Sequence, residues 1–374
     1  MNLKIGQKLT SQEAMNLSIE EAKKGRAWVS PNPPVGCVIL DKDKCFLSTG
    51  YHTSYGKAHA EIEALKKIKD KKKLEGAYVY VTLEPCAHYG KTSPCVDTLI
   101  KYPLDTVYYG QQDCNLKTKG LGLKKLKSKG IKTKKYTLFL QDIEDLYKEF
   151  CYNHAYQKTF VSLKVATSLD GKMGLVDGSS QWISSQASRD YVSHLRAYHD
   201  AVLIGLRTFL EDNPRLNSRK APFNTKKNKV ILLDPKGRSF SLLKSSRLAQ
   251  VRPLSNIIVV TSPKTKISSK EIQSITCPIK SFTRQFDLQE LKSILYLKYG
   301  ISSLLVEGGA FTFSSFLEQK AAGCLYQFLS PCIIGKNGIS WSQELKIKDL
   351  KQKQVLQLRH STSKDADLLL KYLF

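Results

Sequence analysis

The chain has 374 residues, of which 41% are hydrophobic and 25% are charged. This composition is ordinary for a globular protein, and the length predicts two domains. No apolar run approaches the ~20 residues that a membrane-spanning helix needs, and the N-terminus lacks the hydrophobic segment of a signal peptide. These features argue against a membrane protein or membrane partner and predict a cytoplasmic location.

The net charge of +26 suggests either a nucleic acid or an acidic small molecule as the binding partner. Lysine is spread over most of the chain, with clusters over residues 66–73, 117–135 and 346–353. A dispersed excess is more typical of a solvated surface than of a nucleic-acid footprint. We therefore expect an acidic small molecule and no nucleic-acid partner.

The nine cysteines are scattered and lack paired spacing, which favours a reducing compartment over a disulfide framework. Cys86 and Cys95 are interpreted below as metal ligands. The other seven are interpreted as small buried or half-buried residues: Cys37, Cys45, Cys114, Cys151, Cys277, Cys324 and Cys332.

The first half of the chain alternates helix and strand patterns. Thr10 and Glu13 form a capping-box pattern that opens a helix ending at Gly25. The patterns that follow predict, in chain order, a strand over 35–40, a helix over 58–69, strands over 77–83 and 106–109, a helix over 121–129 and a strand over 137–140. Strands that alternate with helices predict an α/β layer.

A junction near residues 150–158 precedes a second series of elements. The patterns there predict strands over 160–166, 201–204, 229–234, 256–261 and 302–307, with helices over 186–198 and 311–319. We find no internal repeat. The sequence therefore predicts an α/β protein with two unlike domains, over residues 10–149 and 159–374.

Four residues of the first domain carry a specific chemical pattern. His59 and Glu61 lie in the first turn of a predicted helix, Cys86 follows a predicted strand, and Cys95 comes nine positions later. Two thiolates and one imidazole are typical ligands of catalytic zinc, which keeps its fourth position for water. A zinc deaminase also needs a glutamate that is not a ligand and sits beside the histidine. The pattern predicts hydrolytic removal of an amino group from a base-like ring, with Glu61 as the proton carrier.

The spacing of the two cysteines differs from that of most zinc deaminases, because eight residues separate them instead of two. The segment Thr82–Cys95 and the loop Ser30–Gly36 resemble a specific family, the bacterial bifunctional deaminase–reductases of riboflavin biosynthesis. The resemblance extends over nearly the whole chain. It implies a cytidine-deaminase-like three-layer domain followed by a domain with the fold of dihydrofolate reductase.

The resemblance also implies a substrate for the first domain, a diaminopyrimidinone that carries a ribosylamino 5-phosphate. Its ring amino group would be hydrolysed to a carbonyl with release of ammonia. The residues implied to contact ring, ribose or phosphate are Asn32, His52, Lys91, Asp113 and Asn115. Amide and carboxylate groups suit polar ring edges and a lysine suits a phosphate, although asparagines most often serve in turns. Cys114 stands where the family usually has proline.

A further histidine lies between the two cysteines. His88 is interpreted as a loop residue, because a fourth protein ligand would close the catalytic position of the metal.

The second domain has no G-x-G-x-x-G fingerprint for a dinucleotide. Glu307, Gly308 and Gly309 end a predicted strand and open a predicted helix. Glycines at such a position allow backbone N–H groups to approach a cofactor phosphate. They are equally typical of an ordinary turn between a strand and a helix.

The resemblance implies that the second domain uses NADPH to open and reduce the ribose to a ribityl chain. The segments that carry it are Ser162–Lys172, Ser180–Ser184 and Asp212–Asn217. Arg196 and Arg219 would clamp the substrate phosphate, although Arg196 could also be a surface arginine. The ribose end would be lined by Lys164, Asp212, Leu216 and Glu307. The cofactor groove would be lined by Ser168, Trp182, Ser184, Asn213, Asp234, Glu307, Gly308 and Gly309.

The sequence thus favours a two-step enzyme with zinc and NADPH, which deaminates and then reduces a small phosphorylated pyrimidine; we expect a homo-oligomer. The alternative is a tRNA or nucleoside deaminase with an added module. The long spacing between Cys86 and Cys95 and the reductase-like second half argue against it. A third possibility, a metal-stabilised scaffold without activity, leaves Glu61 without a role.

Overall fold

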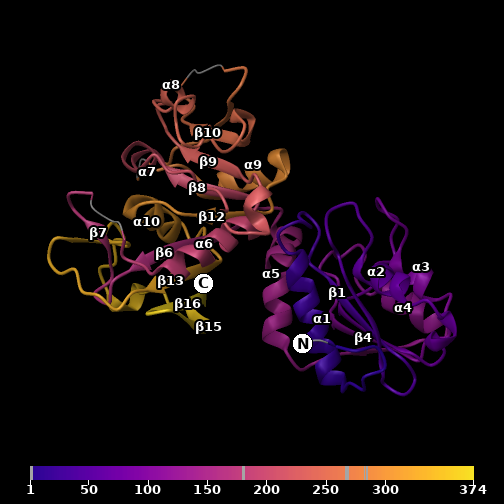
Figure 1. Ribbon diagram of the computed structural model, residues 1–374. Coiled ribbons are helices and arrows are strands. Elements are labelled where there is room, and N and C mark those ends of the chain that lie inside the picture. Colours follow the sequence, from indigo (N-terminus) through magenta and orange to yellow (C-terminus); the bar gives the residue numbers. More distant parts are fainter. Residues whose placement is uncertain (1–2, 179–181, 266–268, 282, 284) are drawn as a thin grey trace. The chain divides into compact units, whose positions relative to one another are not determined.

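The computed structural model describes residues 3–178, 182–265, 269–281, 283 and 285–374. The chain divides into two compact units, residues 1–156 and 157–374, each of which is described by itself (Figure 1). Within the described ranges, no helix combines the length and the apolar character that crossing a membrane requires.

The first unit contains a five-stranded sheet in the order β2-β1-β3-β4-β5. Strand β1 is antiparallel to β2 and β3, while β3, β4 and β5 run parallel to one another. Its elements are α1 (Ser11–Gly25), β1 (Gly36–Leu40), β2 (Phe46–Tyr51), α2 (Ala60–Lys67), β3 (Tyr78–Leu83), α3 (Cys95–Leu99), β4 (Thr106–Gln111), α4 (Leu121–Ser128), β5 (Lys132–Lys135) and α5 (Leu140–Tyr156).

The side chains of β1 contribute in turn to the two hydrophobic cores of this unit, because successive side chains of a strand point to opposite faces of the sheet. Cys37 and Ile39 pack with residues of α2, α3 and α4. Val38 and Leu40 pack with residues of α1 and α5 on the other face. Figure 1 shows α1 and α5 side by side next to the sheet. The predicted three-layer domain is therefore confirmed.

The capping box at the start of α1 is present. The Thr10 side chain accepts a hydrogen bond from the Glu13 backbone N–H, and the Glu13 carboxylate accepts one from the Thr10 backbone N–H. Such a cap typically stabilises a helix by about 1 kcal/mol. The helix ends at Gly25 as the sequence predicts.

The strand predicted over 137–140 is wrong. The last strand, β5, lies earlier, and Leu140 begins helix α5, which runs through part of the predicted junction to Tyr156. Ile143, Leu146 and Tyr147 recur at helical spacing and are buried against the sheet. Burial of this apolar stripe outweighs the strand preference of the short run before it.

The second unit contains a nine-stranded sheet in the order β11-β10-β9-β8-β12-β6-β13-β16-β15, and a small sheet of β7 and β14. The strands from β11 to β13 in this order are parallel, and β16 and β15 close the sheet with antiparallel pairs. Its elements are β6 (Phe160–Thr167), β7 (Lys172–Leu175), α6 (Gln186–Tyr198), β8 (Ala201–Gly205), α7 (Leu206–Asp212), β9 (Lys229–Leu233), α8 (Phe240–Leu243), β10 (Ile257–Thr261), β11 (Gln273–Thr276), α9 (Leu288–Tyr299), β12 (Ser303–Val306), α10 (Ala310–Glu318), β13 (Cys324–Leu329), β14 (Gly338–Ser340), β15 (Gln357–Lys364) and β16 (Asp367–Leu373).

Helices cover both faces of the large sheet. Residues of α9 and α10 pack on Leu163 and Leu203, whereas residues of α7 and α8 pack on Val202 and Val230 on the opposite face. In open α/β sheets, ligands bind beyond the carboxyl ends of the parallel strands. The carboxyl ends of β6, β8, β9 and β12 are therefore where a binding site is expected.

Candidate functional site

The three predicted zinc ligands converge in the first unit. His59 is the N-cap residue of α2, Cys95 is the first residue of α3, and Cys86 lies in the turn after β3. His59 Nδ1 lies 3.4 Å from Cys86 Sγ and 3.2 Å from Cys95 Sγ, and all three donor atoms lie within 4.8 Å of one another. Tetrahedral zinc with Zn–S near 2.3 Å and Zn–N near 2.0 Å places such donors ~3.5–3.8 Å apart. The donor set therefore fits zinc in both chemistry and spacing.

The surroundings of Cys86 favour its thiolate form. The Cys95 thiol and the imidazole of His59 lower the pKa of Cys86 to about 4. The backbone N–H of Cys95 also donates to Cys86 Sγ over 3.3 Å. Cys86 shares a proton with Cys95, whose pKa is raised by the same hydrogen bond. Zinc binding would release that proton, because both sulfurs bind the metal as thiolates.

Glu61 lies in the first turn of α2, two residues after His59, and only 3% of it is exposed. Burial raises the pKa of Glu61, and the negative charge of Cys86 adds to the effect. A carboxylate with a raised pKa is a stronger base than a free one, which suits the role of a general acid–base residue.

His52 and Asn32 lie next to the metal ligands. The rings of His52 and His59 meet edge to face at 5.1 Å between centroids. His52 Nδ1 lies 3.1 Å from the carbonyl oxygen of Ala58, and its Nε2 lies 3.2 Å from the amide nitrogen of Asn32. Because a carbonyl only accepts, Nδ1 carries the proton and Nε2 accepts from Asn32. Burial lowers the pKa of His52, which is consistent with this neutral form.

Lys91 belongs to the eight-residue insertion between the two cysteine ligands and is exposed. Its ammonium group lies 4.2 Å from the centroid of the Tyr55 ring. Cation–π contacts of this kind hold an ammonium group in place while it remains open to solvent. In the same insertion, Thr92 Oγ1 lies 3.5 Å from His59 Nε2.

Asp113 and Asn115 lie in the loop between β4 and α4. Asp113 accepts hydrogen bonds from the backbone N–H of Asn115 and from the Thr118 hydroxyl, at 2.9 and 2.6 Å. The side chain of Asn115 accepts from the backbone N–H of Lys117 at 3.1 Å. These contacts within the loop give Asn115 the turn geometry that asparagine commonly adopts. The buried Glu84 carboxylate accepts from the N–H of Asp113, a contact that the sequence pattern did not reveal.

Cys114 and Cys151 are half-buried, as the sequence predicts, but the preference for a reducing compartment over disulfides did not anticipate that they are paired. The structure joins them in a disulfide across 37 residues, with Cα atoms 5.1 Å apart. The pairing arises because α5 lies against β4, and Cys114 sits in the loop that leaves β4. The other seven cysteines, which include the candidate metal ligands Cys86 and Cys95, form no disulfide.

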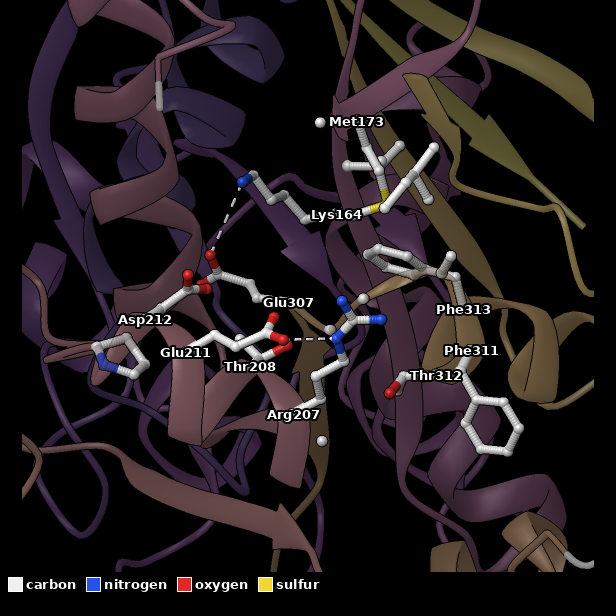
Figure 2. Close-up of a pocket in the computed structure, with 18 of the residues that line it drawn as sticks. Lys164, Met173, Arg207, Thr208, Glu211, Asp212, Glu307, Phe311, Thr312 and Phe313 are labelled. Carbon is white, nitrogen blue, oxygen red and sulfur yellow. Dashed lines mark hydrogen bonds and ion pairs between the residues drawn. The ribbon is translucent and has the colours of Figure 1, made fainter. Parts of the chain in front are cut away.

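The second unit contains a cavity of about 750 Å³ at the carboxyl ends of the strands named above. Ten of the residues predicted to bind substrate or cofactor line it. They are Lys164, Trp182, Ser184, Arg196, Asp212, Leu216, Arg219, Glu307, Gly308 and Gly309. Figure 2 shows Lys164 and Glu307 pointing toward each other in this cavity.

Three charged side chains form a buried network in the wall of the cavity. Arg196 donates to both carboxylate oxygens of Glu307, at 2.6 and 2.9 Å, and to the carbonyl of Asn217 at 3.2 Å. Lys164 Nζ lies 3.8 Å from the same carboxylate. Burial would raise the pKa of Glu307, but the charge and hydrogen bonds of Arg196 lower it. Burial lowers the pKa of Lys164. Glu307 is thus a fixed anion at the end of β12.

Three predicted cofactor residues do not line the cavity. The Ser168 hydroxyl is hydrogen-bonded within its own turn to Asp170 and Lys172. Asn213 accepts from the backbone N–H of Arg247, and Asp234 accepts from that of Ser239. Their side chains shape the loops around the site. Ser180 and Gln181, which belong to the predicted segment Ser180–Ser184, lie outside the described residues.

Other lining residues were not predicted from the sequence, among them Met173, Thr208 and Phe311 (Figure 2). They lie on elements whose apolar patterns gave no chemical signal. The structure also explains Gly308, because a Cβ atom there would lie 2.6 Å from the Thr312 side chain. A side chain at this position would displace the start of α10.

Comparisons with known proteins agree with this two-part architecture. Residues 9–111 match the cytidine and deoxycytidylate deaminase zinc-binding region, and residues 159–370 match the RibD C-terminal domain. The riboflavin biosynthesis protein RibD of Aquifex aeolicus is 33% identical over 86% of this chain and 87% of its own length. The RibD of Buchnera aphidicola is 35% identical over the same shares.

The chain belongs to the RibD family. It is a bifunctional enzyme of riboflavin biosynthesis, a deaminase and a reductase, and its cofactors are zinc and NADPH. Solved RibD structures share the whole fold. Acinetobacter baumannii RibD superposes with a TM-score of 0.83 at 29% identity, covering 97% of this chain and 98% of its own. The deaminase–reductase of Thermotoga maritima has the same TM-score and coverage at 30% identity. The reductase half accordingly has the dihydrofolate-reductase-like fold that the resemblance implied.

The cysteine pairing of this RibD chain can be checked by alkylation. We expect iodoacetamide to modify seven cysteines in the denatured, zinc-free, unreduced protein, and nine after reduction, because only Cys114 and Cys151 are paired. Intact mass spectrometry would count the adducts. The Cys151→Ser variant is the control, since it should show the same number of adducts before and after reduction. Nine adducts without reduction would contradict the disulfide.

Proposed function

We propose that residues 10–149 deaminate 2,5-diamino-6-(5-phosphoribosylamino)pyrimidin-4(3H)-one, and that residues 159–374 then reduce the ribosyl group of the product to ribityl. The convergence of His59, Cys86 and Cys95 beside the buried Glu61 carries the first assignment. The Thermotoga maritima relative is named as a deaminase and reductase of phosphoribosylaminopyrimidines. The dispersed lysines favour this small substrate over a nucleic acid.

In the deamination, Glu61 carries the protons. Zinc, when bound, activates water for attack on the ring carbon that bears the amino group. Glu61 takes one proton of this water and passes it to the adjacent ring nitrogen. It then moves the second proton to the amino group, which leaves as ammonia while the ring carbon becomes a carbonyl. The raised pKa of Glu61 suits a group that accepts and donates in turn.

Five further residues would position the pyrimidine. The Asn32 amide and the neutral His52 imidazole lie beside the metal ligands, where they meet the polar edge of the ring. Lys91 would meet the phosphate from the edge of the site. Asp113 and Asn115 would contact ring or ribose from the loop after β4.

In the reduction, the wall of the cavity holds the ribose end of the substrate. NADPH, when bound, supplies the hydride. Glu307 is held in place by Arg196 and faces Lys164, so both side chains can meet ribose oxygens with Asp212 and Leu216 beside them. Trp182, Ser184 and the turn at Gly308 and Gly309 would line the cofactor groove. Ser168, Asn213 and Asp234 would act on the cofactor through the loops that they hold.

The two arginines assigned to the substrate phosphate differ in how much of their hydrogen-bonding capacity is free. The guanidinium of Arg196 donates hydrogen bonds to Glu307 and Asn217. Its positive charge would attract the phosphate, while its N–H groups remain directed at Glu307 and Asn217. Among the described residues, no carboxylate pairs with Arg219, and Arg219 lines the cavity. Arg219 therefore offers the phosphate a free planar fork of donors.

The Glu61→Gln variant tests the role of the carboxylate. We expect ammonia release to fall by at least ~10²-fold, because an amide cannot carry the proton, while one zinc ion per chain remains bound. Glu63→Gln is the control on the same helix, since Glu63 pairs with Lys66 at the surface. Ammonia release and metal content would be measured together. Deamination at the wild-type rate in Glu61→Gln would refute the proposed role.

The Arg219→Ala variant tests the phosphate contact in the reductase half. Loss of one charged hydrogen-bond contact costs roughly 1.5–3 kcal/mol, or about ten- to a hundred-fold in binding. We expect the KM for the deaminated intermediate to rise by this factor, with ammonia release unchanged. NADPH oxidation would report the reduction. Lys244→Ala is the control, because Lys244 pairs with Glu271 at the surface; an unchanged KM in Arg219→Ala would contradict the contact.

We further propose that the enzyme is a cytoplasmic homo-oligomer. Apart from the Cys114–Cys151 pair and the two metal-site cysteines, five cysteines form no disulfide, which is more typical of a reducing compartment than of a disulfide framework. Strand β15 is the last of its sheet, and Val355, Leu358 and Phe374 are exposed on or beside the β15–β16 hairpin. Sheet edges with apolar side chains pair readily with another chain.

The oligomeric state can be tested by sedimentation. We expect a mass of at least two chains, and we expect Leu358→Lys to shift the equilibrium toward monomer because it places a charge in the proposed contact. Leu297→Lys, at an exposed position on α9, is the control. A monomer at all concentrations would contradict the proposal.

A further inference from the structure

Glu84 has an unusual set of partners for a buried carboxylate. It lies directly after β3 and is 5% exposed. Its Oε2 accepts from the backbone N–H groups of Asp113 and Gly120, at 3.2 and 3.0 Å. Its Oε1 accepts from those of Gly122 and Leu123, at 3.1 and 3.4 Å. In the described part of the chain, Glu84 is thus satisfied by main-chain donors rather than by a lysine or arginine.

These donors lie at both ends of one loop. Asp113 begins the loop that follows β4, Gly120 is the N-cap residue of α4, and Gly122 and Leu123 lie in the first turn of that helix. One carboxylate therefore closes the loop over residues 112–120 and holds the start of α4. Inside the loop, Asp113 binds the N–H of Asn115 and the hydroxyl of Thr118, so that fixing its ends fixes its centre.

The same contacts tie the loop to the metal ligands. Glu84 is separated from Cys86 only by Pro85. A Cβ atom on Gly122 would lie 2.0 Å from the carbonyl oxygen of Pro85, so the start of α4 approaches this turn as closely as backbone allows. The turn that carries Cys86 and the loop that carries Asp113 and Asn115 are therefore held as one unit.

We infer that Glu84 is a positioning residue for deamination, which sets the distance between the metal site and the substrate contacts of the loop over residues 112–120. This inference rests on the proposed contacts of Asp113 and Asn115 with the substrate. Glu84 itself touches neither substrate nor metal. Replacing Glu84 raises the KM for the diaminopyrimidinone far more than it changes kcat. The loop over residues 112–120 is then no longer held in position, whereas Glu61 and the zinc ligands stay where they are.

The Glu84→Gln variant isolates this effect at nearly constant volume. An amide presents one oxygen and one NH2 group, so two of the four N–H donors would face another donor. We expect the deaminase KM to rise about ten- to a hundred-fold, with kcat within about threefold of the wild type and one zinc ion per chain. NADPH-dependent reduction of the deaminated intermediate should be unchanged. Glu75→Gln, an exposed position before β3, is the matched control.

A second variant separates positioning from folding. Glu84→Asp keeps the charge but is one methylene shorter, so it should give a smaller rise in KM than Glu84→Gln. If both variants lose zinc, and the KM of the zinc-loaded fraction stays at the wild-type value, Glu84 is only structural and the inference is overturned. An unchanged KM in fully zinc-loaded Glu84→Gln overturns it as well.

The Asn115→Ala variant distinguishes failure of the inference from failure of the proposed substrate contact. If Asn115→Ala raises the KM and Glu84→Gln does not, the contact stands and the inference fails. If Asn115→Ala and Asp113→Ala both leave the KM unchanged, the proposed contacts fail and the inference with them. The inference is supported if Asn115→Ala, Asp113→Ala and Glu84→Gln each raise the KM, and if the double variant Glu84→Gln/Asn115→Ala raises it by less than the product of the two single effects. Such non-additivity shows that the two residues act through one loop.

Discussion

The deaminase half depends on the approach of one imidazole nitrogen and two sulfurs to within a few ångströms of one another. These donors come from the start of α2, the turn after β3 and the start of α3. Each position is an element end that a buried core holds in place, since the residues behind the donors belong to one apolar cluster. The same frame buries Glu61 beside the donors and thereby raises its pKa. Packing and chemistry are linked here because two helices that cover the sheet, α2 and α3, begin at two of the three donor residues, His59 and Cys95.

The reductase half uses a comparable arrangement without a metal. The carboxyl ends of β6, β8, β9 and β12 surround a cavity, and a buried network of Arg196, Glu307 and Lys164 fixes its charged wall. Removing one member of such a network would leave the others buried without a partner, which is costly in a low-dielectric interior. The two halves therefore share a principle: parallel strands end at one edge, and polar side chains from distant parts of the sequence meet there.

Helices and strands with a strong, regular local pattern were predicted correctly from the sequence. The capping box of Thr10 and Glu13, the helix over 186–198 and the buried strands of the large sheet have strong, regular patterns. The strand predicted over 137–140 failed because the apolar stripe of α5 extends over a longer range than the short run that suggested a strand. The hairpin of β15 and β16 was not predicted, since its exposed residues and lysines give no clean alternation. The pairing of Cys114 with Cys151 could not be seen either, because nothing in the spacing of two cysteines 37 residues apart records that α5 lies against β4.

The sequence by itself determined the chemistry of the first half, because the residue types and order of His59, Glu61, Cys86 and Cys95 predict a zinc deaminase. For the second half, only the resemblance to the family implied a reductase. Only the tertiary structure decided how the groups act on one another. It placed Glu84 across both ends of the loop over residues 112–120, engaged Arg196 with Glu307 and used Ser168, Asn213 and Asp234 to shape turns. The physical reason is that ligand identity is a local property of side chains. Hydrogen-bond partners and burial, by contrast, depend on which distant segments the packed cores bring together.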